Sequence, residues 1–193
     1  LLTKVFNNSH LKNLGMEGNP SEFGIYLSLI KSNNLHIKKS DEFVISIENT
    51  NNKSIKIIYD EFLKLIKSSK EAVNVSDIYA HFIKQPYGIK IGLLPILIGI
   101  FFKATEASCA FYNKDEQGRE SLITEFDQKI AERLYHMPET LKIMFVKIEG
   151  EKQIILDEFK SYVEKNFLNN RPIENATPLY VLKPIVVKAY KLP

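Results

Sequence analysis

The apolar positions in the first part of the chain follow a helical period and then an alternating one. Pro20-Ser21-Glu22 offers capping chemistry for a helix, after which four apolar residues recur on one helical face: Phe23, Tyr26, Leu27 and Ile30. Two runs rich in β-forming residues follow, at 35–37 and 43–47, and a charged turn over 38–42 separates them. A short helical unit followed by a β-hairpin is typical of a winged-helix module.

A regular apolar stripe predicts the next helix. Its members lie three or four residues apart after the polar segment 49–52, and they are Ile55, Ile58, Tyr59, Phe62, Leu63 and Ile66. The polar segment 67–70 that follows fits either a linker or a turn between helices. We place a domain boundary there.

The second half of the chain again predicts helices, and two prolines, Pro86 and Pro95, interrupt them. Residues 74–77 can start a helix, which must stop near Gln85-Pro86 because the residue before proline avoids the helical region. Pro86-Tyr87-Gly88 predicts a tight turn. The apolar run over 89–102 is shorter than the ~20 residues of a membrane span, so it predicts a buried helix with Pro95 either in its first turn or at a kink.

Residues 107–112 and 141–148 have strand character, and we expect them to pair with each other. Between them, Thr124 and Asp127 have the spacing of a capping box and predict a helix that ends at Pro138. The apolar positions assigned to this helix are Phe126, Ile130, Leu134 and Met137. Helix, helix, strand, helix, strand is compatible with a second winged-helix-like module that carries an inserted helix.

A further helix is predicted after Gly150, and a last one from Lys183-Pro184, with proline in its first turn. The apolar face expected for the former comprises Ile155, Phe159, Tyr162, Val163 and Phe167. The predicted fold class is therefore α+β, mostly α, with two winged-helix-like modules and additional helices. The predicted units are 1–70, 71–150 and a C-terminal helical segment at 151–193.

Charge and cysteine content change this picture little. The 193 residues include 26 Lys and Arg against 23 Asp and Glu, a balance of +3 that lacks the concentrated basic charge of a dedicated nucleic-acid binder. Cys109 is the single cysteine, which favours a reducing compartment and a small buried apolar role. We expect a cytoplasmic protein without a membrane segment, and we expect a fragment of a longer chain because the sequence starts without methionine.

The sequence contains no recognisable motif for catalysis, cofactor binding or metal binding. The glycine-rich phosphate loops and the nucleophile elbow are missing, and no two of the four histidines have the close spacing of a metal-binding pair. We therefore assign no catalytic, cofactor or metal site. One weaker signal is basic: Lys31, His36, Lys38 and Lys39 surround the first hairpin, and Lys84 and Lys90 flank the Pro-Tyr-Gly turn. Because wings touch phosphate backbones in many winged-helix proteins, these six are candidate nucleic-acid contacts.

Three stretches carry a family resemblance: residues 18–26, residues 86–97 and residues 177–184. The most distinctive is the Pro-Tyr-Gly-x-x-x-Gly-x-x-Pro block from Pro86 to Pro95. Together they resemble the region that follows the nucleoside-triphosphatase core in large, poorly characterised bacterial ATP-binding proteins, some of which are associated with restriction or phage defence. The resemblance runs from about Gly18 onward and implies that the ATPase lies N-terminal to these residues. It transfers no catalytic residue.

Three functions remain open at this point. The favoured one is a non-catalytic interaction or regulatory segment of a larger intracellular ATP-dependent protein, with the remainder of that chain as its partner. The second is a DNA-binding winged-helix module, which the lysines of the first hairpin favour. The third is an enzyme with an unrecognised site.

Overall fold

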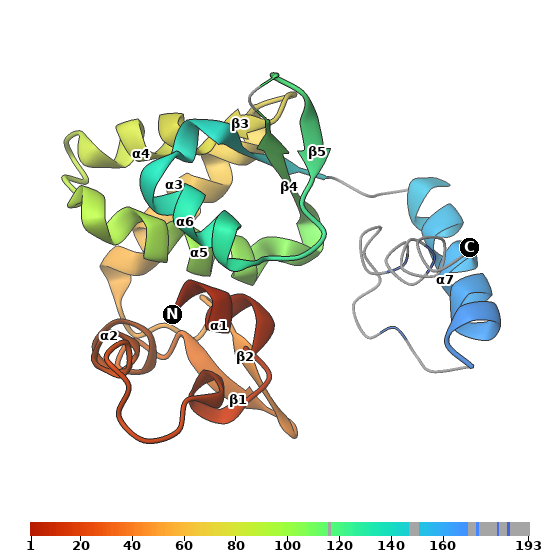
Figure 1. Ribbon diagram of the computed structural model, residues 1–193, viewed down its shortest axis with the longest axis horizontal. Coiled ribbons are helices and arrows are strands. Elements are labelled where there is room, and N and C mark those ends of the chain that lie inside the picture. The colour runs from red at the N-terminus through yellow and green to blue at the C-terminus, as the bar shows by residue number, and fades with distance from the viewer. Residues whose placement is uncertain (116, 147–150, 170–172, 174–180, 182–184, 186–193) are drawn as a thin grey trace.

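The protein is α+β and mostly helical, as predicted, in a computed structural model that describes residues 1–115, 117–146, 151–169, 173, 181 and 185 (Figure 1). In chain order the described α-helices are α1 (Leu2–Asn7), α2 (Phe23–Ile25), α3 (Lys53–Ser68), α4 (Val75–Ile83), α5 (Leu94–Thr105), α6 (Gln128–His136) and α7 (Glu151–Phe167). The described strands are β1 (His36–Lys39), β2 (Glu42–Ile45), β3 (Val73–Asn74), β4 (Cys109–Lys114), β5 (Glu120–Leu122) and β6 (Leu141–Phe145).

The helix predicted after Pro20 forms, but most of it is π-helical. α2 is followed directly by a π-helix over Tyr26–Lys31, in which Tyr26 and Ile30 are buried while Leu27 is 39% exposed. The side chains of Ser28 and Ser32 donate hydrogen bonds to backbone carbonyls one turn back, which competes with the regular helical ladder. The wider turn removes Leu27 from the predicted buried face.

The predicted hairpin and its neighbouring helix are confirmed. β1 and β2 are antiparallel, with Ile37 opposite Val44. In α3, every residue of the predicted stripe is buried or packs on the core, and the side chain of Asn52 caps the helix by accepting the backbone N–H groups of Ser54 and Ile55.

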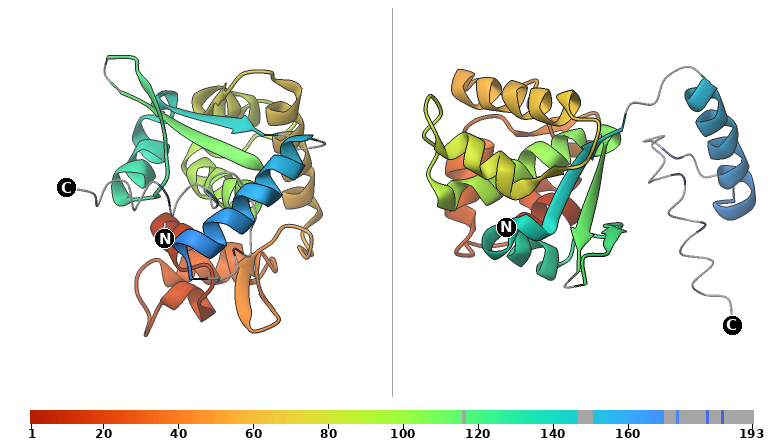
Figure 2. Two further views of the ribbon diagram at one scale, coloured as in Figure 1. Left: turned by 90° about the vertical axis from the view of Figure 1, so that its right-hand side faces the viewer. Right: turned by 90° about the horizontal axis from the view of Figure 1, so that it is seen from above.

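A four-stranded sheet with the order β3-β6-β4-β5 lies along one side of the helices of the second part of the chain (Figures 1 and 2). The predicted pairing of β4 with β6 is confirmed, with Phe111 opposite Ile143. β6 lies between β3 and β4, although it is the last of the strands in sequence. The strands β3 and β5 were not predicted, and residues 147 and 148 of the predicted last strand lie outside the described residues.

The apolar run becomes the central helix α5. Pro95 lies in its first turn, and ten of its twelve residues are buried, from Leu94 to Phe102 and then Thr105. α1, α6 and β2 all pack on this helix. Within the described chain, Ile91–Ser108 has the length and mean hydropathy of a membrane span. However, 56% of this segment is buried inside the protein, and the core helix of a soluble protein can have the same length and hydropathy.

One continuous apolar core joins residues on both sides of position 70. Leu2, Tyr26 and Phe62 belong to the same buried cluster as Phe101 and Ile143. Residues 1–70 and 71–145 therefore do not have separate cores, and the proposed boundary at 67–70 is a short connection between α3 and β3.

The cap of α6 and the buried face of α7 differ from the predictions. Asp127, rather than Thr124, caps α6 by accepting the N–H of Ile130 at 2.8 Å. In α7, Leu156 and Val163 pack with Ile173 and Val181 in a second, smaller cluster, whereas Ile155 and Tyr162 of the predicted face are 64% and 56% exposed. Figure 2 shows α7 beside the main body, beyond the end of β6. The predicted helix from 183–184 lies outside the described residues.

Candidate functional site

The Pro-Tyr-Gly block forms one wall of an open apolar groove. The backbone turns sharply after α4, where the N–H groups of Tyr87 and Gly88 both donate to the carbonyl of Lys84. Gly88 has a φ of +58°, which glycine adopts without the steric penalty of a side chain. The N–H of Ile89 then donates to the carbonyl of Phe82, so the following segment runs back along the end of α4 toward α5.

The other two walls come from segments far away in sequence. One is the stretch 25–33 around the π-helix, and the other is the first turn and a half of α3. The groove has a volume of about 930 Å³ and its lining is mainly apolar. Its apolar lining side chains are Ile25, Leu29, Ile55, Ile58, Ile89, Leu93, Ile96 and Leu97.

Two asparagines hold these two walls together. Asn52 Nδ2 donates to Asn33 Oδ1 at 2.9 Å, while Asn33 Nδ2 donates to the carbonyl of Leu29 at 2.7 Å. Thr50 Oγ1 adds a hydrogen bond to the carbonyl of Asn33 at 2.8 Å. Since Asn52 also caps α3, the groove wall and the helix start are fixed by the same side chain. The groove is therefore formed before any partner arrives.

Several large apolar side chains remain in contact with water at this groove. Ile25 and Leu93 line it with exposed fractions of 43% and 38%, and Leu27 and Ile91 beside them are 39% and 68% exposed. Gly92 also lines the groove, and a Cβ built at this position meets no atom within 4 Å. Packing inside the protein therefore does not require glycine here, and the bare backbone leaves room for a close approach from outside.

The charge around the groove is positive. Among the described lining residues, Lys90 is the only charged one. Lys31 ends the π-helix that forms one wall, and Lys56 lies one helical turn after Asn52, so it shares that side of α3. All three lysines are exposed.

The structure separates the six candidate nucleic-acid contacts. Lys38 and Lys39 are exposed on β1, and Lys84 follows the last residue of α4. Lys90 lines the groove, and Lys31 is the last residue of the π-helix beside it. His36 is 6% exposed, and burial lowers its pKa below the ordinary value of 6.5. Its Nε2 lies 2.8 Å from the carbonyl oxygen of Ser9 and its Nδ1 lies 3.0 Å from Tyr26 Oη. His36 is therefore a core residue with both ring nitrogens satisfied and is not available to a phosphate.

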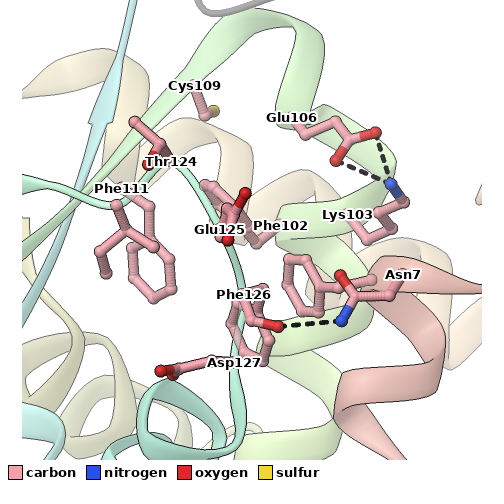
Figure 3. A pocket seen from close by; sticks show the side chains of 12 residues that line it. Asn7, Phe102, Lys103, Glu106, Cys109, Phe111, Thr124, Glu125, Phe126 and Asp127 are labelled. Carbon is pink, nitrogen blue, oxygen red and sulfur yellow. Dashed lines mark hydrogen bonds and ion pairs between the residues drawn. The ribbon is translucent and has the colours of Figure 1, made fainter. Parts of the chain in front are cut away.

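A second hollow lies on the other side of α5, with a volume of about 370 Å³ (Figure 3). Four phenylalanines from α1, α5, β4 and the segment before α6 surround it: Phe6, Phe102, Phe111 and Phe126. Cys109 also lines this cavity, and burial raises the pKa of its thiol to about 11. At neutral pH this thiol is protonated, which argues against a nucleophilic role.

No group of three or more His, Cys, Asp or Glu side chains with metal-binding geometry occurs in the described part of the chain. The groove was not predicted as a site, because its walls meet only in the folded protein; the one signal in the sequence was the Pro-Tyr-Gly block itself. Comparison of the chain with family models, with curated proteins and with solved structures gives no match, so the groove and the cavity stand on their geometry alone.

Proposed function

We propose that this chain is a non-catalytic interaction segment of a larger ATP-dependent protein, and that its groove binds an amphipathic helix from the remainder of that protein. The observation that supports this most strongly is the preformed apolar groove with four exposed aliphatic side chains in or beside it. An amphipathic helix buries side chains at i, i+4 and i+7 in grooves of this kind. The lysines around the groove favour a helix with carboxylates beside those anchors.

The element order supports a winged-helix-like interpretation of residues 53–145. α3, β3, α4, α5, β4 and β6 follow one another as in such a module, β6 lies between β3 and β4, and β5 with α6 forms an insertion. In a winged-helix DNA-binding protein the third helix enters the major groove. Here that helix is α5, and ten of its twelve residues are buried. Because a buried helix cannot enter a DNA groove, this burial favours a role in protein contacts.

The test uses two fluorescein-labelled helical peptides that carry leucine at i, i+4 and i+7. One has glutamates beside the leucines and the other has lysines there. Fluorescence anisotropy with the whole chain is expected to show binding of the glutamate peptide and at least tenfold weaker binding of the lysine peptide. Gly92→Val places a branched side chain in the groove and is expected to abolish binding.

Gly24→Val is the matched control, since a Cβ at Gly24 also meets no atom within 4 Å and this residue does not line the groove. Equal binding of both peptides, or unchanged binding by the Gly92→Val variant, would refute the proposed docking mode.

DNA binding is the second candidate function, and the exposed Lys38 and Lys39 on β1 favour it. The measurement is anisotropy of a labelled 20-base-pair duplex between about 20 and 200 mM salt. Binding whose log K falls linearly with log salt, and that a Lys38→Ala and Lys39→Ala double variant weakens, would support it. Absence of binding at the lowest salt concentration excludes it.

A further inference from the structure

The aromatic cavity beside α5 has a floor of closely packed phenylalanine rings and a rim that is exposed to water at Glu125 and Asp127. The rings of Phe6 and Phe126 are stacked with centroids 3.6 Å apart, and those of Phe102 and Phe111 are 4.5 Å apart. Phe102, Phe111 and Phe126 are each less than 9% exposed. The faces of aromatic rings carry partial negative charge, which attracts cations.

Carboxylates outnumber ammonium groups around this cavity. Its charged lining residues are Lys103, Glu106, Glu125 and Asp127. Lys103 Nζ is paired with both carboxylate oxygens of Glu106, at 2.7 and 2.8 Å, so these two charges compensate each other. Asp127 is engaged in capping α6.

Glu125 is therefore the carboxylate that can meet a ligand. Glu125 lies at the exposed rim of the cavity, where Figure 3 labels it, and it makes no hydrogen bond or ion pair with the described residues. The adjacent residues fix its position: Phe126 is buried among the rings, and the carbonyl of Phe126 accepts a hydrogen bond from Asn7 Nδ2 at 3.1 Å. The backbone that carries Glu125 is thus tied to α1 on one side of the cavity.

We propose that this cavity binds an organic cation, namely an ammonium or guanidinium group carried on a short alkyl body. The alkyl part would contact the phenylalanine rings, and the charge would lie between the ring faces and the Glu125 carboxylate. An anion is disfavoured by the negative charge of the Glu125 carboxylate. A neutral apolar group gains no electrostatic attraction from the Glu125 carboxylate. The same chemistry is offered by a free alkylammonium ion and by a lysine or arginine side chain of another protein.

The experiment compares choline with 3,3-dimethylbutanol, its neutral carbon isostere, by isothermal titration calorimetry and by NMR of phenylalanine ring signals. Choline is expected to bind and to shift the ring signals, while the isostere at the same concentration does not. Glu125→Gln is expected to weaken choline binding about three- to tenfold through loss of the charge. Glu132→Gln is the matched control, because Glu132 is exposed on α6 and does not line the cavity.

A further arm distinguishes the two sources of the cation. A pentapeptide Gly-Ser-Lys-Ser-Gly and its arginine analogue are titrated in the same way. Tighter binding of a peptide than of choline assigns the cavity to a side chain of a protein partner, and tighter binding of choline assigns it to a small molecule. Equal binding of choline and its isostere, unchanged binding by Glu125→Gln, or no binding up to about 10 mM of choline and of both peptides would each overturn the proposal.

Discussion

Replacing His36 tests whether this residue is a core residue, as its contacts indicate. The change His36→Ala removes two hydrogen bonds: the one that Tyr26 Oη donates to the ring and the one that the ring donates to the carbonyl of Ser9. Tyr26 is only 2% exposed. A backbone carbonyl oxygen can only accept a hydrogen bond, so His36 Nε2 carries the proton that is donated to Ser9. His36 Nδ1 is then unprotonated and accepts the hydrogen bond from the Tyr26 hydroxyl. A buried hydroxyl without a partner costs about 1–3 kcal/mol and the second lost hydrogen bond about 1 kcal/mol. We expect the free energy of unfolding to fall by roughly 2–4 kcal/mol.

The assay is urea unfolding followed by circular dichroism at 222 nm. His10→Ala is the control because His10 is exposed, and we expect it to change the free energy of unfolding by less than about 0.5 kcal/mol. If His36→Ala is as stable as His10→Ala, the structural role assigned to His36 is wrong.

The same histidine makes stability depend on pH. Burial lowers the pKa of His36 in the folded state below its ordinary value of 6.5, so on acidification the unfolded chain binds the proton first. The stabilisation from neutral His36 is fully present above pH 6.5 and is lost as the pH falls from there through the lower folded-state pKa. The difference in unfolding free energy between the native protein and His36→Ala should therefore shrink between pH 7.5 and 5.5. A constant difference over this range would contradict the assignment.

Three further predictions concern core packing, helix capping and the burial of the thiol. Phe62→Ala, at a residue 0% exposed, is expected to lower the free energy of unfolding in urea by about 3–5 kcal/mol, whereas Ile57→Ala, at a residue 60% exposed, changes it little. Asp127→Ala removes the cap of α6 and should cost about 1 kcal/mol in the same assay; a similar loss for Thr124→Ala would reinstate the capping box predicted from sequence. Cys109 should react with Ellman's reagent at pH 8 only after unfolding in urea, since its thiol is buried with a pKa of about 11. Rapid reaction of the native protein would contradict that burial.

Local patterns were sufficient where one face of an element is apolar and the other is polar. α3 is such a helix, and its stripe identified both its existence and its buried side. The pairing of β4 with β6 was also accessible, because both runs are rich in β-forming residues.

The pattern fails where a segment has two apolar faces. In α7, Ile155, Phe159 and Tyr162 form one stripe and Leu156, Val163 and Phe167 form another. Only the neighbours of the helix decide between them, and these neighbours are Ile173 and Val181. The strand β3 escaped prediction for a related reason, since two residues become a strand only through their partners on β6.

The candidate sites depend even more on tertiary structure. The Pro86–Pro95 block could be singled out in the sequence, yet the groove needs Asn33 and Asn52 to bring two distant segments against it. The aromatic cavity combines residues of α1, α5 and β4 with the segment before α6, which no sequence spacing could associate.

The central position of β6 in the sheet has a consequence for synthesis on the ribosome. Leu141 and Ile143 are 0% exposed, and β6 provides hydrogen-bonding partners to both β3 and β4. A nascent chain that ends before residue 141 therefore lacks the middle of its sheet, and β3 and β4 have no common neighbour. Cooperative folding of the main body should begin only after β6 has left the exit tunnel, and until then the apolar helix α5 is a natural target for chaperones.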